Sequence, residues 1–439
     1  MSQDPREMIS NSPMSGLQVF VVAITIGLNA LDGFDVLAIS FASPGIAAEW
    51  GIDRAALGIV LSMELIGMCI GSIVIGGMAD KFGRRPIILS CLCIMAIGMF
   101  MATTVKGVAD LSIWRVITGL GIGGMLASIN AVAAEFSNNK WRHLNVSLMT
   151  IGYPLGAVIG GLVTSAMLET MNWRSVFYFG AGVTFVSIPL VYFFVPESVH
   201  WLTQKQPLGA VDRVNKVLKH ISKPVISSMP VISEAVRKRS IGDIFAPGLV
   251  ATTLIVTAAY FFHITTFYFI LKWVPKIVVD MGFLASSAAD VLVWANVGGL
   301  VGGLLFGLLT LKLDVKHLSI AILVISTLMV TLFGRSPADL STLSILCAVA
   351  GFCTNAGVVG LYALFAHSFP THVRAFGTGF AIGIGRGGAV LSPILAGFLF
   401  DAGFGLPTVA FILALGSLIA AALLLFLKVQ KNYAVIEDN

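Results

Sequence analysis

The chain has 439 residues, of which 57% are hydrophobic and only 11% are charged. Soluble domains carry about 25% charged residues, so this composition excludes an ordinary water-soluble enzyme. The formal net charge is +5, but the cations fall in short loops between apolar segments and form no basic patch interleaved with aromatic residues, which excludes nucleic acid as a partner. We expect an all-α integral membrane protein.

The chemistry-bearing motifs of enzymes are missing from the sequence. The five cysteines lie within apolar segments in no metal-binding or disulfide pattern, and we find no phosphate-binding loop, zinc-protease motif or nucleophile elbow. We therefore expect no enzymatic activity, no cofactor and no metal. The first sixteen residues are polar and lack the apolar core of a signal peptide, so the N-terminus should stay in the cytoplasm.

Twelve apolar stretches are each long enough to cross a bilayer, which takes about 20 residues of helix. A polar segment at 196–246, rich in Lys and Arg, separates six spans from six. We predict an N-terminal six-helix bundle in 1–195, a cytoplasmic linker at 196–246, and a C-terminal six-helix bundle with a short cytoplasmic tail in 247–439. The predicted spans are 17–41, 54–79, 87–105, 110–135, 144–168, 174–195, 247–272, 286–311, 317–334, 340–366, 376–400 and 405–427.

The distribution of Lys and Arg predicts the orientation. Of 27 such residues, nineteen fall on the side of the two termini and five on the opposite side, so both termini should be cytoplasmic. The five are Arg54, Lys106, Arg174, Lys276 and Arg335, and three more, Arg115, Lys272 and Arg386, lie within or at the edge of spans. The nineteen are Arg6, Lys81, Arg84, Arg85, Lys140, Arg142, Lys205, Arg213, Lys216, Lys219, Lys223, Arg237, Lys238, Arg239, Lys312, Lys316, Arg374, Lys428 and Lys431.

The two halves of the chain repeat each other weakly. A shift of 231 residues aligns Pro44 with Pro275, and a shift of 232 aligns Arg142 with Arg374. Internal repetition of this kind is typical of transporters built from duplicated bundles. We predict two pseudo-symmetric bundles with a central cavity.

Residues 76–85 read GGMADKFGRR and stand between spans 2 and 3. This resembles the loop signature G-x-L-A-D-x-x-G-R-[RK] of the major facilitator superfamily, and further resemblance lies in RVITGLG at 115–121, GYPLG at 152–156 and PESVHWL at 196–202. The resemblance implies the major facilitator fold. A role for the loop charges in topology alone is the alternative.

The same loop is the expected cytoplasmic gate. Its glycines permit a tight turn and close helix contact, and its charges can sit at helix ends or against Glu135. We expect Glu135 to pair with Arg84 or Arg142, unless it is simply a solvated loop charge. The gate residues are Gly77, Asp80, Gly83, Arg84, Arg85, Glu135 and Arg142.

Residues 32–35 read DGFD, and this D-G-x-D in span 1 is similar to the signature of the aromatic acid:proton symporter family, with which WVP at 273–275 and GRGGA at 385–389 agree. The resemblance implies proton-coupled import of an aromatic carboxylate of the hydroxybenzoate, protocatechuate or vanillate kind, for catabolism, by a protein of the bacterial inner membrane that works as a monomer. The alternatives are a proton-driven efflux antiporter, a symporter of another small organic acid, and a transporter-like receptor.

Charged residues inside the spans are costly and usually functional. Helix rise places Asp32, Asp35, Glu64 and Arg115 in the outer half of the N-terminal bundle, about 8 to 15 Å from the outer surface. Three acids against one arginine favour a raised pKa for at least one acid, so we place proton coupling there. We prefer Asp35 paired to Arg115 with Asp32 titrating, although the reverse assignment and a permanent ion network fit as well.

Arg386 lies about 18 Å from the inner surface, near the midplane of span 11. Its planar guanidinium suits a carboxylate, so we expect it to bind the substrate carboxylate, the alternative being a pair with an acid of the N-terminal bundle. Lys272 is a further candidate, although snorkelling at the outer end of span 7 explains it equally well. The other candidates can stack on or hydrogen-bond a ring, or can be packing residues: His263, Asn296, Tyr153, Tyr260, Tyr362, Phe34, Phe261 and Phe267.

Overall fold

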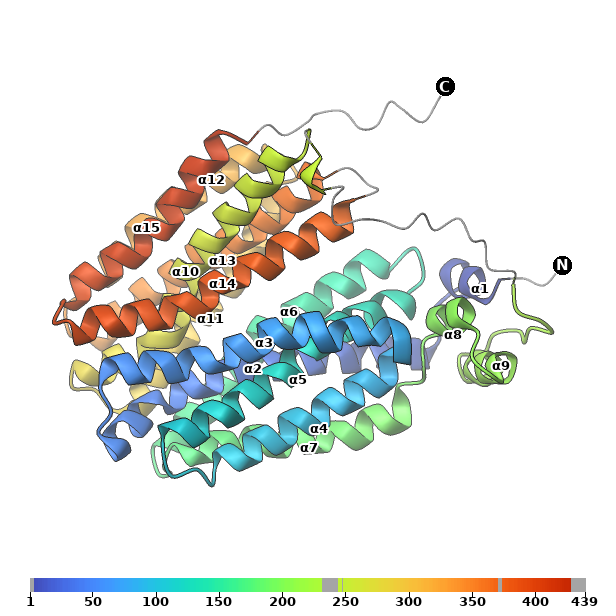
Figure 1. Cartoon of the computed structure of the whole chain (residues 1–439), viewed down its shortest axis with the longest axis horizontal. Helices are drawn as coiled ribbons and strands as arrows, with labels where there is room; N and C mark the ends of the chain where they lie inside the picture. Colours follow the sequence, from blue (N-terminus) through green and yellow to red (C-terminus); the bar gives the residue numbers. More distant parts are fainter. Residues whose placement is uncertain (1–3, 231–243, 247, 370–372, 428–439) are drawn as a thin grey trace. The chain divides into compact units, whose positions relative to one another are not determined.

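The computed structural model describes residues 4–230, 244–246, 248–369 and 373–427 (Figure 1). Within these residues, twelve helices are long and apolar enough to cross a membrane and no strand occurs, which confirms the predicted number of spans. They are α2 (Gly16–Trp50), α3 (Arg54–Phe82), α4 (Arg84–Ala102), α5 (Val108–Glu135), α6 (Arg142–Leu168), α7 (Arg174–Phe194), α10 (Val250–Asp280), α11 (Ala285–Leu309), α12 (Val315–Phe333), α13 (Leu340–Ser368), α14 (Arg374–Asp401) and α15 (Leu406–Leu425).

Two spans are longer than their apolar stretches indicate. The first was expected to end at Phe41, but α2 continues past Pro44 to Trp50, and α10 continues past Pro275 to Asp280. Proline usually ends or kinks a helix because it lacks the N–H donor, yet both helices run on. Lys272 therefore lies about two turns before the end of α10 and not at its end.

Three short helices are polar or amphipathic and were not expected. They are α1 (Pro5–Asn11), α8 (Val199–Lys205) and α9 (Ala210–His220), and α1 and α8 contact each other (Figure 1). The segment between the halves of the chain is thus partly helical where it is described. Of the expected cytoplasmic cations, Arg237, Lys238, Arg239, Lys428 and Lys431 lie outside the described residues.

Two compact units emerge from the contacts. Unit 1 is Met1–Ala38, Ile66–Gly160 and Arg174–Arg237, and in it α4 packs against α5 and α7 (Figure 1). Unit 2 is Ile39–Leu65, Gly161–Trp173 and Lys238–Asn439, and in it α10 packs against α11, α13, α14 and α15. The division into two six-helix bundles at 196–246 stays a prediction.

Unit 2 thus contains the C-terminal ends of α2 and α6 and the N-terminal end of α3. We call this side of the spans the distal end. It carries the α2–α3, α6–α7, α10–α11, α12–α13 and α14–α15 connections. Within unit 2 the distal segments of α2, α3 and α6 are packed with the helices of the second half of the chain.

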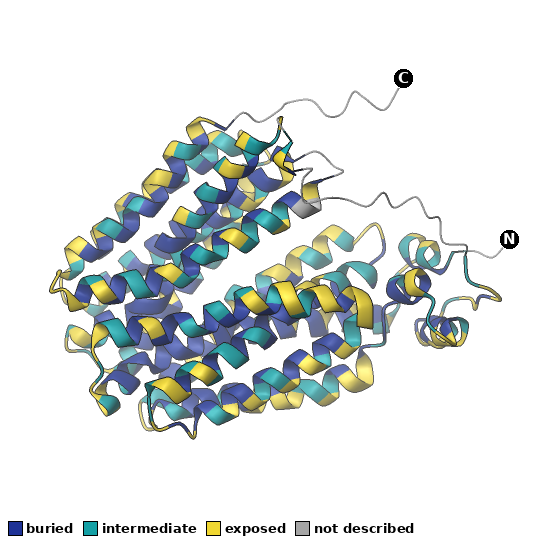
Figure 2. Cartoon of the chain, in the orientation of Figure 1, coloured by how far each residue is buried: buried dark blue, intermediate teal, exposed yellow. Residues whose placement is uncertain are grey.

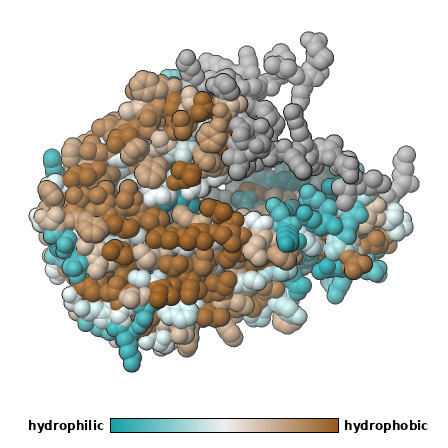
Figure 3. Space-filling model, in the orientation of Figure 1, coloured by the Kyte–Doolittle hydropathy of each residue, from teal (hydrophilic) through white to brown (hydrophobic). Residues whose placement is uncertain are grey.

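The surface of the spans is apolar. The spans carry exposed as well as buried positions (Figure 2), and the exposed ones include Ile73, Phe185 and Phe193, each at least 69% exposed. Figure 3 shows hydrophobic side chains over the spans and more hydrophilic ones around α1, α8 and α9. Such side chains are stable in hydrocarbon and unfavourable in water, so the protein is a multi-pass membrane protein.

Candidate functional site

The two aspartates of α2 lie in unit 1 and are buried, Asp32 at 2% and Asp35 at 0% exposure. Gly33 between them faces α6, because a Cβ atom there would lie 1.9 Å from the main-chain oxygen of Tyr153. One turn earlier, the Asn29 amide donates to the carbonyl of Met149 at 2.7 Å. The close α2–α6 contact therefore requires glycine between the two acids.

Arg115 on α5 is fully buried and lies against Asp35. Its guanidinium donates to the main-chain carbonyl of Asp35 at 3.0 Å and to the Met99 sulfur at 3.0 Å, and lies 5.3 Å from the centre of the Phe177 ring. Asp32 lies one turn before Asp35 on the same helix. The structure thus brings Arg115 to Asp35, and we call Asp32, Asp35 and Arg115 the acid cluster. Which acid exchanges a proton stays a prediction.

The sequence analysis grouped Glu64 with Asp32, Asp35 and Arg115, but the structure assigns it to the other unit. It lies in unit 2, where its Oε2 is 3.7 Å from the Nζ of Lys272, and both side chains are 0% exposed. The interpretation of Lys272 as a snorkelling residue is wrong, because α10 runs on to Asp280 and buries this lysine within the bundle. The local sequence showed neither that α10 continues to Asp280 nor that Lys272 lies next to Glu64 of α3.

A second group of candidate residues lies on α10, α13 and α14 of unit 2. The hydroxyls of Tyr260 and Tyr362 are 3.1 Å apart, and the ring of Phe365 lies 5.7 Å from Tyr260 and 5.9 Å from Tyr362. We call these three residues the aromatic cluster. Arg386 of α14 is partly exposed. A Cβ atom at Gly385 would lie 2.1 Å from the Tyr260 ring. The absence of a side chain at Gly385 therefore lets this ring pack on α14 at the residue before Arg386.

The remaining candidates for substrate binding lie outside this cluster. His263 is fully buried, with Nδ1 2.9 Å from the Ser417 hydroxyl and Nε2 2.8 Å from the Thr354 carbonyl, so its ring links α10, α15 and α13. These are the surroundings of a packing histidine. Asn296 donates to the Leu292 carbonyl of its own helix and is 6% exposed.

Two aromatic candidates belong to unit 1. Phe34 is 3% exposed and its ring meets that of Phe179 edge to face at 5.2 Å, which is core packing. Tyr153 is partly exposed and lies where α6 approaches Gly33. Phe261 and Phe267 of α10 are partly exposed.

The predicted gate loop is a connected charge cluster in unit 1. The Arg84 guanidinium donates to Asp80 at 2.6 Å and reaches Glu135 at 3.3 Å. Of the two expected partners of Glu135, Arg84 is therefore the one it contacts, while Arg142 donates to the Ala134 carbonyl and to the Ser10 hydroxyl.

The glycines of this loop differ in what they do. Gly83 has φ of +106°, a conformation that L side chains rarely adopt, and it provides the turn before α4. Gly77 has open space around it, so the expected close helix contact is not present there. The Arg85 guanidinium lies 5.1 Å from the Tyr192 ring.

Glu197 contacts the predicted gate loop, and the sequence reasoning passed it over. Its Oε1 accepts the main-chain N–H of Arg84 at 2.9 Å and that of Ser198 at 2.9 Å, with Arg85 N–H at 3.4 Å. A carboxylate at a helix N-terminus is stabilising because the first N–H groups have no partner within the helix. The PES motif at 196–198 was the available signal, but it did not reveal that its acid caps α4.

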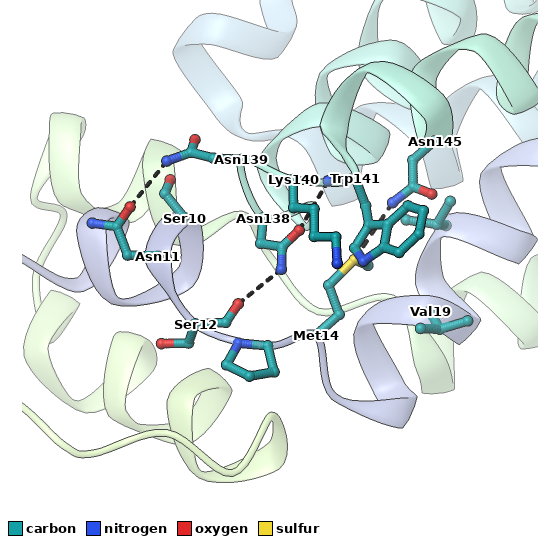
Figure 4. Close-up of a pocket in the computed structure, with 12 residues that line it drawn as sticks. Ser10, Asn11, Ser12, Met14, Val19, Asn138, Asn139, Lys140, Trp141 and Asn145 are labelled. Carbon is teal, nitrogen blue, oxygen red and sulfur yellow. Dashed lines mark hydrogen bonds between the residues drawn. The ribbon is translucent and has the colours of Figure 1, made fainter.

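The N-terminal segment is tied to the α5–α6 loop in unit 1. Asn138 donates to the Ser12 carbonyl at 3.0 Å, and the main-chain N–H of Asn139 donates to the Ser10 carbonyl at 2.8 Å. A pocket of about 750 Å³ lies beside them, with Lys140 and Trp141 next to each other on its wall (Figure 4). The N-terminal segment is thus a folded part of unit 1 and not a loose extension.

A buried acid–arginine cluster, a separate arginine beside aromatic rings and twelve spans together define a helical membrane transporter. The sequence model of the Major Facilitator Superfamily matches residues 25–295 and 256–437. The chain belongs to this superfamily and is a transporter, not an enzyme.

Known relatives refine the comparison. The chain is 25% identical to a "Gallate transporter" of Pseudomonas putida, covering 96% of this chain and 94% of the relative. It is 27% identical to the "4-hydroxybenzoate transporter PcaK" of Acinetobacter baylyi, covering 97% and 94%. The fold is similar to that of a D-xylose-proton symporter, with a TM-score of 0.70 at 20% identity over 92% of this chain and 97% of the other. The predicted resemblance to aromatic acid transporters of this superfamily is confirmed.

Proposed function

We propose that the protein imports an aromatic carboxylate together with protons by alternating access. The observation that carries the proposal is that Gly385, next to Arg386 in the sequence, packs directly on the Tyr260 ring of the aromatic cluster in unit 2. A guanidinium offers a planar fork of donors to a carboxylate, and aromatic side chains stack on or contact the edge of a ring. The relatives named as gallate and 4-hydroxybenzoate transporters support the same substrate class.

Proton coupling falls to the acid cluster of unit 1. Asp32 and Asp35 are buried within a span, where desolvation favours the neutral form of a carboxyl group, while Arg115 beside Asp35 favours the charged form. We assign Asp32 as the exchanging acid and Asp35 as the acid held by Arg115. In this cycle, protonation from outside and docking of the anion precede inward opening, and the empty carrier returns after deprotonation.

The membrane, the oligomeric state and the orientation of the protein are part of the same proposal. We place the protein in the bacterial inner membrane as a monomer of two six-helix bundles, with both termini cytoplasmic and the distal end facing outward. The gate cluster of Asp80, Arg84, Glu135 and Glu197 then lies at the cytoplasmic face. Its contacts can hold that face during outward opening and rearrange when the cavity opens inward.

Uptake into energised right-side-out vesicles tests the proposal. Labelled 4-hydroxybenzoate, gallate and benzoate are compared with and without an uncoupler, for the unaltered protein and Asp32→Asn. We expect accumulation that the uncoupler and the substitution both abolish. Loss of preloaded compound in place of accumulation would replace import by efflux.

The role of Arg386 has its own test in the same vesicles. Arg386→Lys keeps the charge but loses the fork, so the apparent affinity for the carboxylate should fall about tenfold, which corresponds to about 1.4 kcal/mol. Arg335→Lys changes an exposed loop arginine in the same conservative way and should leave uptake unchanged. Unaltered affinity in Arg386→Lys would rule out a substrate carboxylate on this residue.

A further inference from the structure

The pocket of about 750 Å³ in unit 1 lies where the N-terminal segment, the start of α2 and the connection between α5 and α6 meet (Figure 4). Its volume is typical of ligand pockets, which span about 300–1,000 Å³. The described residues that line it include none of the acid cluster, the aromatic cluster or the gate cluster. Part of the lining is polar, with residues 10–13, Asn138, Asn139 and Asn145, and part is apolar, with Met14, Val19 and Val22. The pocket therefore suits an amphipathic ligand.

The polar lining is held in place by hydrogen bonds within the protein. The Asn138 side chain donates to the Ser12 carbonyl at 3.0 Å and accepts the main-chain N–H of Trp141 at 3.1 Å. The Asn145 side chain donates to the Ser137 hydroxyl at 2.8 Å. Because these bonds already fix the lining, a ligand enters a formed pocket and its binding requires little ordering of the protein.

The charge around the pocket is positive. Lys140 is exposed and lines the pocket, and the described lining contains no Asp or Glu. Two further cations are bonded to lining residues. Lys223 Nζ donates to the Pro13 carbonyl at 2.8 Å, and the Arg142 guanidinium donates to the Ser10 hydroxyl at 3.0 Å. The pocket is thus complementary to an anion.

The charge of Lys140 is not neutralised by a neighbouring acid. Glu135 is 3.3 Å from Arg84, and Asp4 is 2.6 Å from Arg6, so both acids have other partners. In the part of the chain that the structure describes, Lys140 forms no ion pair, and its ammonium lies 5.1 Å from the centre of the Trp141 ring. This ammonium is therefore available to a ligand.

The position of the pocket along the spans is that of lipid headgroups. Lys140 and Trp141 directly precede α6, and Val19 lies in the first turn of α2. Trp141 is 44% and Val19 56% exposed, and the exposed Leu144 and Leu148 continue an apolar surface along α6. Trp and Lys at the ends of spans are typical of the membrane–water interface. The polar lining thus faces the headgroup region, and the apolar residues continue towards the acyl chains.

We propose that the pocket binds the headgroup of an anionic phospholipid from the leaflet on the side of the two termini. The lipid phosphate pairs with Lys140, the rest of the headgroup contacts the polar lining, and an acyl chain follows Val19 and the exposed leucines of α6. Basic pockets between membrane helices bind anionic headgroups in this way. A zwitterionic headgroup also carries a cation, for which the described lining offers no carboxylate. Only the assignment of this leaflet to the cytoplasmic side rests on the proposed function.

Fluorescence of Trp141 measures occupancy in the purified full-length protein in detergent micelles. Phosphatidylglycerol with brominated acyl chains quenches a nearby tryptophan, and the difference between the unaltered protein and Trp141→Phe isolates the emission of Trp141. Brominated phosphatidylethanolamine is the zwitterionic comparison. We expect half-maximal quenching by phosphatidylglycerol at a lipid fraction at least about fivefold lower, which is the effect of one lysine at an anionic surface.

Substitutions of Lys140 test the proposed contact, each measured with and without Trp141→Phe. Lys140→Gln should raise the half-maximal fraction of phosphatidylglycerol about fivefold and abolish the preference. Lys140→Arg keeps the charge and should retain the preference. Lys312→Gln is the matched control, because Lys312 is an exposed lysine between the exposed Leu311 and Leu313 outside the pocket. It should leave the quenching unchanged.

Equal quenching by the two lipids, or a preference that survives Lys140→Gln, would overturn the lipid site. Inorganic phosphate added at constant ionic strength distinguishes a lipid from a soluble anion. Displacement of phosphatidylglycerol by phosphate would assign the pocket to a soluble anion and would also overturn the proposal. The assay requires neither transport nor a defined leaflet, so a failure of the proposed aromatic acid uptake does not alter its result.

Discussion

Replacing Glu197 by alanine removes the carboxylate that accepts the first main-chain N–H groups of α4. The acid is 8% exposed, and the N–H groups of Arg84 and Arg85 point at a single oxygen of it, at 2.9 and 3.4 Å. In the variant these donors lose an acceptor that is itself buried. The start of α4 should therefore fray.

The magnitude follows from two contributions. Loss of a helix N-cap acceptor costs about 0.5–2 kcal/mol, and loss of a negative charge at a partly buried helix N-terminus costs about 0.3–2 kcal/mol. Together they predict a local destabilisation of about 1–4 kcal/mol. Glu197→Gln keeps an acceptor oxygen but not the charge, so it should lose about half of this.

Hydrogen–deuterium exchange read by mass spectrometry on the peptide 84–90 measures the effect. A local loss of about 1–4 kcal/mol corresponds to exchange at least about fivefold faster. Ser198→Ala is the control, because the Ser198 hydroxyl accepts from the Trp201 N–H and caps α8 instead of α4. Equal exchange of this peptide in Glu197→Ala and the unaltered protein would refute the capping role.

Three further predictions concern other parts of the molecule. Gly33→Ala should severely reduce the amount of folded protein, because its Cβ atom would lie 1.9 Å from the Tyr153 main-chain oxygen. Gly27 has open space around it, so Gly27→Ala should express normally. Equal yields of the two variants on a gel-filtration profile would disprove the close contact. His263→Phe should lower the free energy of unfolding by about 1–3 kcal/mol, because it removes two buried hydrogen bonds. The pH profile of uptake should stay the same. A shifted profile would indicate that His263 takes part in proton transfer. Burial lowers the pKa of His200 on α8, an effect that Glu135 and Asp4 oppose and that Arg142 and Arg6 reinforce. Protonation of His200 therefore favours the undocked segment. The protection of residues 199–205, corrected for the intrinsic exchange rate at each pH, should fall as the pH is lowered from 7.5 to 5.5, but not in His200→Gln.

The spans and the superfamily could be predicted from the sequence because both depend on local features. A hydrocarbon environment requires each crossing segment to satisfy its own main-chain hydrogen bonds, so a long apolar run becomes a helix. The short loop motif at 76–85 likewise carries its turn and its charges within ten residues. The acid cluster was predictable in part, because Asp32 and Asp35 lie one turn apart on the same helix.

Other features depend on which helices meet, and these only the tertiary structure decided. Apolar length placed Lys272 at the end of a span, but α10 continues past Pro275 and carries the lysine to a buried position against Glu64. His263 contacts partners on α13 and α15 that its local sequence did not show. A charged or polar side chain in a membrane helix takes its role from the partner that compensates it, and that partner comes from a segment distant in sequence whose position is set by packing of the whole bundle.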